Sequence, residues 1–180
     1  MLFRSVSQSR YAGLKRLIVG LGWDALEKKG YAIDCDASAM MLDSTGKLAE
    51  LIYFGNKKSK NGSVGYSGDN LTGEGEGDDE TIIVDIAKIP ENVDKLIFLV
   101  NIYDCKNRKQ EFGMIQNSYI RILNGDNKVE LAKYSLIDNY AGKTALITGE
   151  IYRHNGEWKF NAIGQGTMDK SLTELTEKYR

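Results

Sequence analysis

The sequence is poor in the residues that most often do catalytic or redox work. Its 180 residues include one histidine, His154, and two cysteines, Cys35 and Cys105. A lone histidine beside a predicted hairpin turn is more typical of a structural or surface residue than of a general base. Two widely separated cysteines are too few for a disulfide framework or a zinc site. We therefore expect buried, reduced thiols, with a disulfide between the two as the alternative, and no catalytic function.

Long apolar runs are also missing. The first ten residues alternate polar and apolar side chains, which is unlike a signal peptide, and no stretch of about 20 apolar residues could form a membrane helix. We therefore expect a cytoplasmic protein without a membrane span. The length fits one domain over residues 1–180, with a single core that buries roughly 70% of the surface exposed by the unfolded chain.

The scarcity of proline, with Pro90 alone, and the spacing of short β-type segments predict a mostly-β fold, an antiparallel β-sandwich. Asn-Gly pairs at residues 124–125 and 155–156 predict two hairpins, because both residue types tolerate positive φ. The predicted strands span residues 14–20, 31–41, 50–54, 81–85, 95–103, 118–123, 129–134, 145–152 and 157–162.

A short helix is predicted at the C-terminal end of the sequence. Ser171 and Glu174 have the spacing of a capping box. Leu172, Leu175 and Tyr179 then fall on one helical face, which we expect to pack on the sheet.

The segment with the clearest chemical character is GDNLTGEGEGDDE at residues 68–80, which holds six acids and no base. Carboxylates crowded in this way repel one another unless a cation neutralises them. The interleaved glycines allow the tight backbone angles with which carboxylates and carbonyls can converge. Hard oxygen ligands without histidine or cysteine favour Ca²⁺, whose shell of about 6 to 8 oxygens tolerates irregular geometry. The candidate ligands are Asp69, Asn70, Glu74, Glu76, Asp78, Asp79 and Glu80.

Two further acids, Asp34 and Asp36, lie in a predicted strand. Positions two apart in a strand share a face, so both carboxylates can point outward while residues 33, 35 and 37 face the core. They are candidate ligands of a shared ion, and the alternative is two ordinary solvent-facing aspartates. Asp24 and Asp104 are weaker candidates of the same kind.

Other interpretations of the acidic loop remain open at this point. It could be a plain solvated loop. It lacks the alternating Asp/Asn positions of an EF-hand, and it lacks the Lys and Ser/Thr of a phosphate-binding loop. Its negative charge disfavours nucleic acid as a partner.

Several motifs, read in order, resemble one known family. They are VGLGWD at residues 19–24, DCDAS at 34–38, the acidic segment at 68–80, FG at 112–113, GEIYRHNGEWKF at 149–160 and AIGQG at 162–166. Together they resemble the signature of the TerD family of tellurium-resistance and general stress proteins, from about Leu14 onward. Tyr66 and Tyr103 stand where that family often has histidine.

The resemblance implies a β-sandwich that binds one or more Ca²⁺ ions at acidic loops. It transfers the ligand role to the block at residues 69–80 and to Asp34 and Asp36. It also implies a role in tellurite resistance or general stress, as a metal-dependent binding or scaffold module for other stress-response proteins of unknown identity. Two alternatives stay open: a cyclic-nucleotide-binding module, as in other members of the family, and an enzyme.

Overall fold

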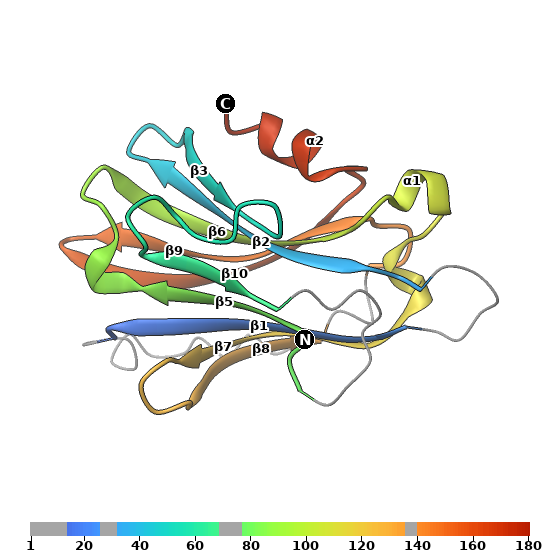
Figure 1. Ribbon diagram of the computed structural model, residues 1–180, viewed down its shortest axis with the longest axis horizontal. Helices are drawn as coiled ribbons and strands as arrows, with labels where there is room; N and C mark the ends of the chain where they lie inside the picture. Colours follow the sequence, from blue (N-terminus) through green and yellow to red (C-terminus); the bar gives the residue numbers. More distant parts are fainter. Residues whose placement is uncertain (1–13, 26–31, 69–76, 136–139) are drawn as a thin grey trace.

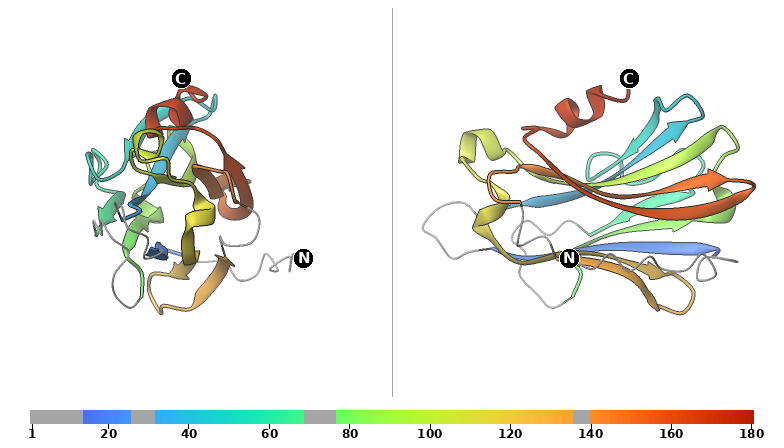
Figure 2. Two further views of the ribbon diagram at one scale, coloured as in Figure 1. Left: turned by 90° about the vertical axis from the view of Figure 1, so that its right-hand side faces the viewer. Right: turned by 180° about the vertical axis from the view of Figure 1, so that it is seen from behind.

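The computed structural model describes residues 14–25, 32–68, 77–135 and 140–180. Two five-stranded antiparallel sheets lie face to face as two layers (Figures 1 and 2), which confirms the predicted β-sandwich. Sheet A contains, in spatial order, β4 (Val64–Ser67), β5 (Glu80–Asp85), β1 (Arg16–Ala25), β7 (Ile115–Asn124) and β8 (Glu130–Ser135). Sheet B contains β10 (Glu157–Thr167), β9 (Ala145–His154), β6 (Val93–Ile102), β2 (Cys35–Asp43) and β3 (Leu48–Ile52).

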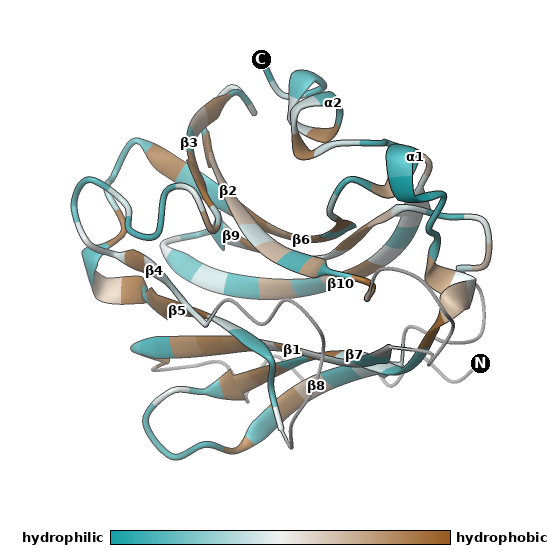
Figure 3. Cartoon of the chain, turned by 45° about the vertical axis from the view of Figure 1, so that its right-hand side comes forward, coloured by the Kyte–Doolittle hydropathy of each residue, from teal (hydrophilic) through white to brown (hydrophobic). Residues whose placement is uncertain are grey.

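The core between the sheets follows from period-2 alternation along each strand. In β1, Leu17, Val19 and Leu21 are buried in the core cluster. Cys35, Cys105 and the large side chain of Trp23 are buried in the same cluster, as expected for both thiols. Figure 3 shows the hydrophobic segments along the strands of both layers and the hydrophilic ones in the connecting turns.

A second, smaller apolar cluster lies on the outer face of sheet B and is covered by α2 (Leu172–Glu177) (Figure 1). Leu175 is fully buried there, and Leu172 and Tyr179 pack against the cluster, which confirms the predicted helix and its apolar face. Ser171 Oγ accepts a hydrogen bond from Glu174 N at 3.2 Å. The Glu174 carboxylate accepts a hydrogen bond from Lys170 N, whereas in a capping box it would accept one from Ser171 N. No helix in the described part of the chain is long and apolar enough to cross a membrane.

Both predicted hairpins form, with different turns. Asn155 and Gly156 have positive φ and join β9 to β10 as a two-residue turn, as predicted. The β7–β8 connection is longer, and its residue with positive φ is Lys128 rather than Asn124 or Gly125. The hairpin was therefore predicted correctly, although the first Asn-Gly pair does not adopt the positive φ that both residue types tolerate.

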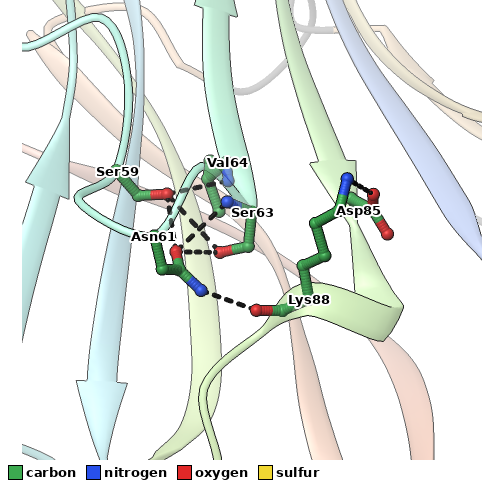
Figure 4. A network of polar contacts seen from close by, with 6 residues as sticks. All are labelled: Ser59, Asn61, Ser63, Val64, Asp85 and Lys88. Atoms are coloured by element: carbon green, nitrogen blue, oxygen red, sulfur yellow. Dashed lines mark hydrogen bonds and ion pairs between the residues drawn. The ribbon is translucent and has the colours of Figure 1, made fainter.

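The structure adds short elements that the sequence pattern did not predict. These are β4, α1 (Cys105–Arg108), η2 (Ile86–Lys88) and η3 (Phe112–Met114). The chain before β4 is held by Asn61, whose Oδ1 accepts from Ser59 Oγ and Ser63 Oγ and whose Nδ2 donates to Lys88 O at 2.6 Å (Figure 4). This network fixes β4 beside β5 and so fixes the strands on either side of the acidic loop.

Candidate metal centre

The acidic loop connects β4 to β5, which are neighbours at one edge of sheet A. Gly68, at the beginning of the loop, has a φ of 97°, a conformation in which an L side chain is strained. Five of the predicted ligands are described by the structure: Asp34, Asp36, Asp78, Asp79 and Glu80. The other four, Asp69, Asn70, Glu74 and Glu76, lie outside the described residues.

Glu80, the first residue of β5, links the two sheets. Its side chain is fully buried (0% exposed). Its Oε2 accepts a hydrogen bond from Ala37 N of β2, and its Oε1 accepts one from Tyr66 OH of β4, both at 2.6 Å. Strand β3 pairs with β2 only from Ala39 onward. At Ala37 the edge of β2 is therefore met by the Glu80 carboxylate.

The environment of Glu80 is unfavourable to its negative charge. Burial raises the pKa of Glu80 to about 8, and repulsion from Asp36 and Asp34 adds to the increase. The hydrogen bonds from Ala37 and Tyr66 oppose it. The pKa of the Cys35 thiol is raised first by burial and then by the surrounding acids, Asp79 among them. Asp34, Asp36, Asp79 and Glu80 thus share one acidic corner, where β5 meets β2, and the name "acidic corner" is used below for these four residues.

The two aspartates at the beginning of β2, Asp34 just before the strand and Asp36 within it, are much less accessible than a solvent-facing pair would be. The neighbouring core residues Ile33, Cys35 and Ala37 point inward as predicted. Asp34 and Asp36, on the alternate positions, are nevertheless buried, and Asp36 is only 3% exposed. The interpretation as two ordinary solvent-facing aspartates is therefore wrong.

Asp79 and Asp78 make different contacts although they are adjacent. Asp79 Oδ2 accepts from Trp23 N at 2.9 Å, and Asp79 N donates to Leu21 O, so Asp79 ties the loop to β1. Asp78 is held on the outer face of sheet A. Arg121 donates from Nε to Asp78 Oδ1 at 2.8 Å and from Nη2 to Oδ2 at 3.0 Å, and Tyr119 OH donates to Oδ1 at 2.9 Å.

Two glycines of β1 make room for these Asp78 contacts. A Cβ at Gly20 would overlap the Asp78 carboxylate, and a Cβ at Gly22 would overlap the Tyr119 ring. This is the physical reason for the Gly-Leu-Gly pattern at residues 20–22. Sequence reasoning missed Arg121, Tyr119 and Tyr66 as residues of the site, and the paired glycines were the only local signal that a bulky polar group lies over β1.

Within the described residues, no three or more acidic, histidine or cysteine side chains are already arranged to hold a metal ion. The weaker candidates, Asp24 and Asp104, accept hydrogen bonds from residues outside the acidic corner. Asp24 accepts from Asn117 Nδ2 at 2.7 Å. Asp104 precedes α1, accepts from Asn107 Nδ2 and lies 3.8 Å from Arg108 Nε. We therefore do not include them in the candidate site.

Comparison with known proteins places the chain in a family. The family model described as "TerD domain" matches residues 5–179. The chain belongs to the TerD family. It is 53% identical over 182 residues to "Stress response protein SCP2" of Bacillus subtilis (strain 168), covering 93% of this chain and 91% of that protein. It is 47% identical over 166 residues to "Tellurium resistance protein TerD" of Serratia marcescens, covering 90% and 86%.

The fold of this TerD-family protein also matches a solved structure. A homologue of telluride resistance protein (TerD) from Streptomyces coelicolor A3(2) superposes with a TM-score of 0.82, at 23% identity, over 93% of this chain and 99% of that one. At this identity the likeness concerns the fold alone. The resemblance drawn from the motifs is confirmed by the family match.

Proposed function

We propose that this TerD-family protein is a Ca²⁺-binding stress-response protein that acts as a metal-dependent binding or scaffold module rather than as a catalyst. The observation that carries the proposal is the acidic corner. Its fully buried Glu80 lies among other carboxylates, and each carboxylate makes ionisation of the others less favourable. A cation bound there would remove that repulsion and stabilise the ionised form.

The chemistry of the available donors fits Ca²⁺. Asp34, Asp36, Asp79 and Glu80 would supply hard oxygen ligands from the beginnings of β2 and β5. The proposed shell of about 6 to 8 oxygens would be completed by the loop ligands predicted from the sequence, Asp69, Asn70, Glu74 and Glu76. Asp78 has a different role, because its carboxylate is already paired with a cation, the guanidinium of Arg121, whose Nε lies 2.8 Å from Asp78 Oδ1. We assign Asp78 to anchoring the end of the loop on sheet A.

A calorimetric titration tests the proposal. Metal-free protein is titrated with Ca²⁺ and separately with Mg²⁺, and its melting temperature is followed at saturation. We expect tighter binding of Ca²⁺ and a raised melting temperature, because a ligand that binds only the native state stabilises it by RT ln(1 + [L]/Kd). An unchanged melting temperature at saturating Ca²⁺ would contradict the proposal.

A matched pair of double variants locates the ion. Asp69→Ala combined with Asp79→Ala should abolish the Ca²⁺-dependent shift in melting temperature. Asp94→Ala combined with Asp126→Ala removes the same charge from a half-buried and an exposed position elsewhere and should leave the shift intact. Equal shifts in the two double variants would show that Ca²⁺ acts away from the acidic loop.

The names of the relatives describe stress response and tellurium resistance, which supports the stress-response part of the proposal. They give no support to the cyclic-nucleotide alternative. Equilibrium dialysis with labelled cyclic nucleotide, with and without Ca²⁺, separates that alternative from a metal-dependent module.

A further inference from the structure

A hollow of about 480 Å³ lies on the outer face of sheet B, between the strands and the beginning of α2. Its strand side is formed by β2, the end of β3 and the end of β6. Its helix side is formed by residues 170–173, Thr176 and Arg180. Volumes of this size are typical of small-molecule sites.

The floor of the hollow is polar. Asp36 of β2 and Asn101 of β6 are directly opposite each other in the strand register, and both line the hollow. Asn101 is 5% exposed, and its Oδ1 has no hydrogen-bond partner among the described residues. A buried acceptor without a partner costs free energy that a ligand N–H donor could recover. Together with the carboxylate of Asp36, this oxygen favours a positively charged donor.

Aromatic rings form the wall beside this floor. Tyr53 and Phe54 make an edge contact with ring centroids 5.2 Å apart, and Phe54 and Tyr103 make another at 6.0 Å. All three residues line the hollow. Aromatic faces near a carboxylate are a common environment for an organic cation, because the ring quadrupole attracts positive charge.

The charges around the hollow are separated by side. Asp36 lines the strand side, and Lys170 lines the helix side. Asp104 and Arg180 also line the hollow, and each has an ion-pair partner beside it: Arg108 Nε lies 3.8 Å from Asp104 Oδ2, and Arg180 Nη1 lies 2.7 Å from Glu177 Oε1. A ligand with a positive group at one end and a negative group at the other would match both sides.

We propose that this hollow binds a small zwitterionic amino compound. Its ammonium group would donate to Asn101 Oδ1 under the influence of Asp36, its methylenes would lie against Tyr53, Phe54 and Tyr103, and its carboxylate would face Lys170 and Arg180. The site shares Asp36 with the proposed Ca²⁺ ligands, whereas Asn101, the aromatic wall and the helix side are not predicted metal ligands.

The ligand class is tested with ω-amino acids of three lengths, β-alanine, γ-aminobutyrate and ε-aminocaproate, by calorimetry and by NMR shifts of amides around the hollow. Chelator is present throughout, so a failure here leaves the Ca²⁺ titration unaffected, and the reverse also holds. For the best-bound member, the analogue without the ammonium and the analogue without the carboxylate should each bind about tenfold or more weakly. Absence of binding by all three at millimolar concentration would overturn the proposal, as would equal binding of the singly charged analogues.

Two variants test the residues, and neither changes a predicted metal ligand. Asn101→Leu should abolish binding without lowering the melting temperature, because it removes an unpartnered buried oxygen. Tyr103 is 44% exposed, so Tyr103→Ala should leave the protein folded while weakening binding several-fold. Tyr152→Ala, on a strand position outside the hollow, is the matched aromatic control and should bind normally. Wild-type affinity in both Asn101→Leu and Tyr103→Ala would overturn the assignment.

Discussion

Three consecutive acids at the end of the acidic loop, Asp78, Asp79 and Glu80, have three different environments. Asp78 pairs with Arg121, Asp79 accepts from the backbone of β1, and Glu80 is buried between the sheets. The density of acidic residues in the sequence does not distinguish these three acids from one another. Their different contacts decide which acid anchors the loop and which acids are available to a cation.

Gly20 provides a direct test of the Asp78 anchor. Gly20→Ala should lower the free energy of unfolding by about 1–2 kcal/mol, because its Cβ would displace the Asp78 carboxylate from Arg121 and Tyr119. Urea denaturation measures the change. In an Asp78→Ala background the same substitution should cost little, because the group it displaces is gone. An equal cost in both backgrounds would mean that the strain arises elsewhere.

The buried carboxyl of Glu80 predicts a pH dependence of stability in chelator. Its folded pKa of about 8 lies above the ordinary value of 4.5, so the folded state keeps a proton that the unfolded state releases between these values. The contribution of Glu80 to the free energy of unfolding should therefore be lost as pH rises from about 4.5 to about 8. Urea titrations across this range should show a flatter dependence in Glu80→Gln than in wild type. Identical slopes would contradict the assignment.

The sequence predicted which residues are acidic and which face the core, but it did not predict which side chains contact one another. The acidic loop and the inward positions of Cys35 and Ala37 followed from local patterns. The Asp78–Arg121 pair joins residues 43 positions apart, and the contact between Glu80 and Ala37 joins two different sheets. No local spacing encodes such contacts, because they depend on strand order.

Among the secondary-structure elements, the strands that were predicted are those rich in β-branched and apolar residues, such as β6 and β9. Strand β4 was missed because Val64–Ser67 is short and contains a glycine, and its place depends on the Asn61 network rather than on its own propensity. Helix α2 was predictable because the cap and the apolar face are both local. The hollow beside α2 was not, since it requires the helix to be placed over sheet B.

The docking of α2 should depend chiefly on one side chain. Leu175 is fully buried in the cluster between the helix and sheet B. Leu175→Ala should lower the free energy of unfolding by about 2–4 kcal/mol through lost burial and a residual cavity. Thr173→Ala, on the exposed side of the same helix, should change it by no more than about 0.5 kcal/mol. Similar denaturation midpoints for the two variants would show that α2 contributes little to stability.

The polar features described above lie on the two outer faces and at one corner of the β-sandwich. The core holds the sheets together, sheet A carries the Asp78 anchor, and sheet B carries the hollow under α2. The acidic corner lies where β5 meets β2, so binding of a cation there would connect the loop to both sheets. By connecting the loop to both sheets, the ion could order the loop into a surface that other proteins bind. Ordering of a segment by a ligand is a known form of switch.

Any tellurite resistance that the chain gives should be indirect, through Ca²⁺-dependent association with other stress-response proteins. Tellurite is an anion and should be repelled by the acidic loop. Both thiols are buried and burial raises the pKa of Cys35 and of Cys105, so little reducing thiolate is available. In cells lacking their own TerD proteins, Cys35→Ala with Cys105→Ala should retain any resistance, whereas Asp69→Ala with Asp79→Ala should lose it.

Pull-downs made with Ca²⁺ and with chelator should recover different proteins. Tight tellurite binding by the purified, metal-free chain, together with identical pull-downs, would reject this mechanism.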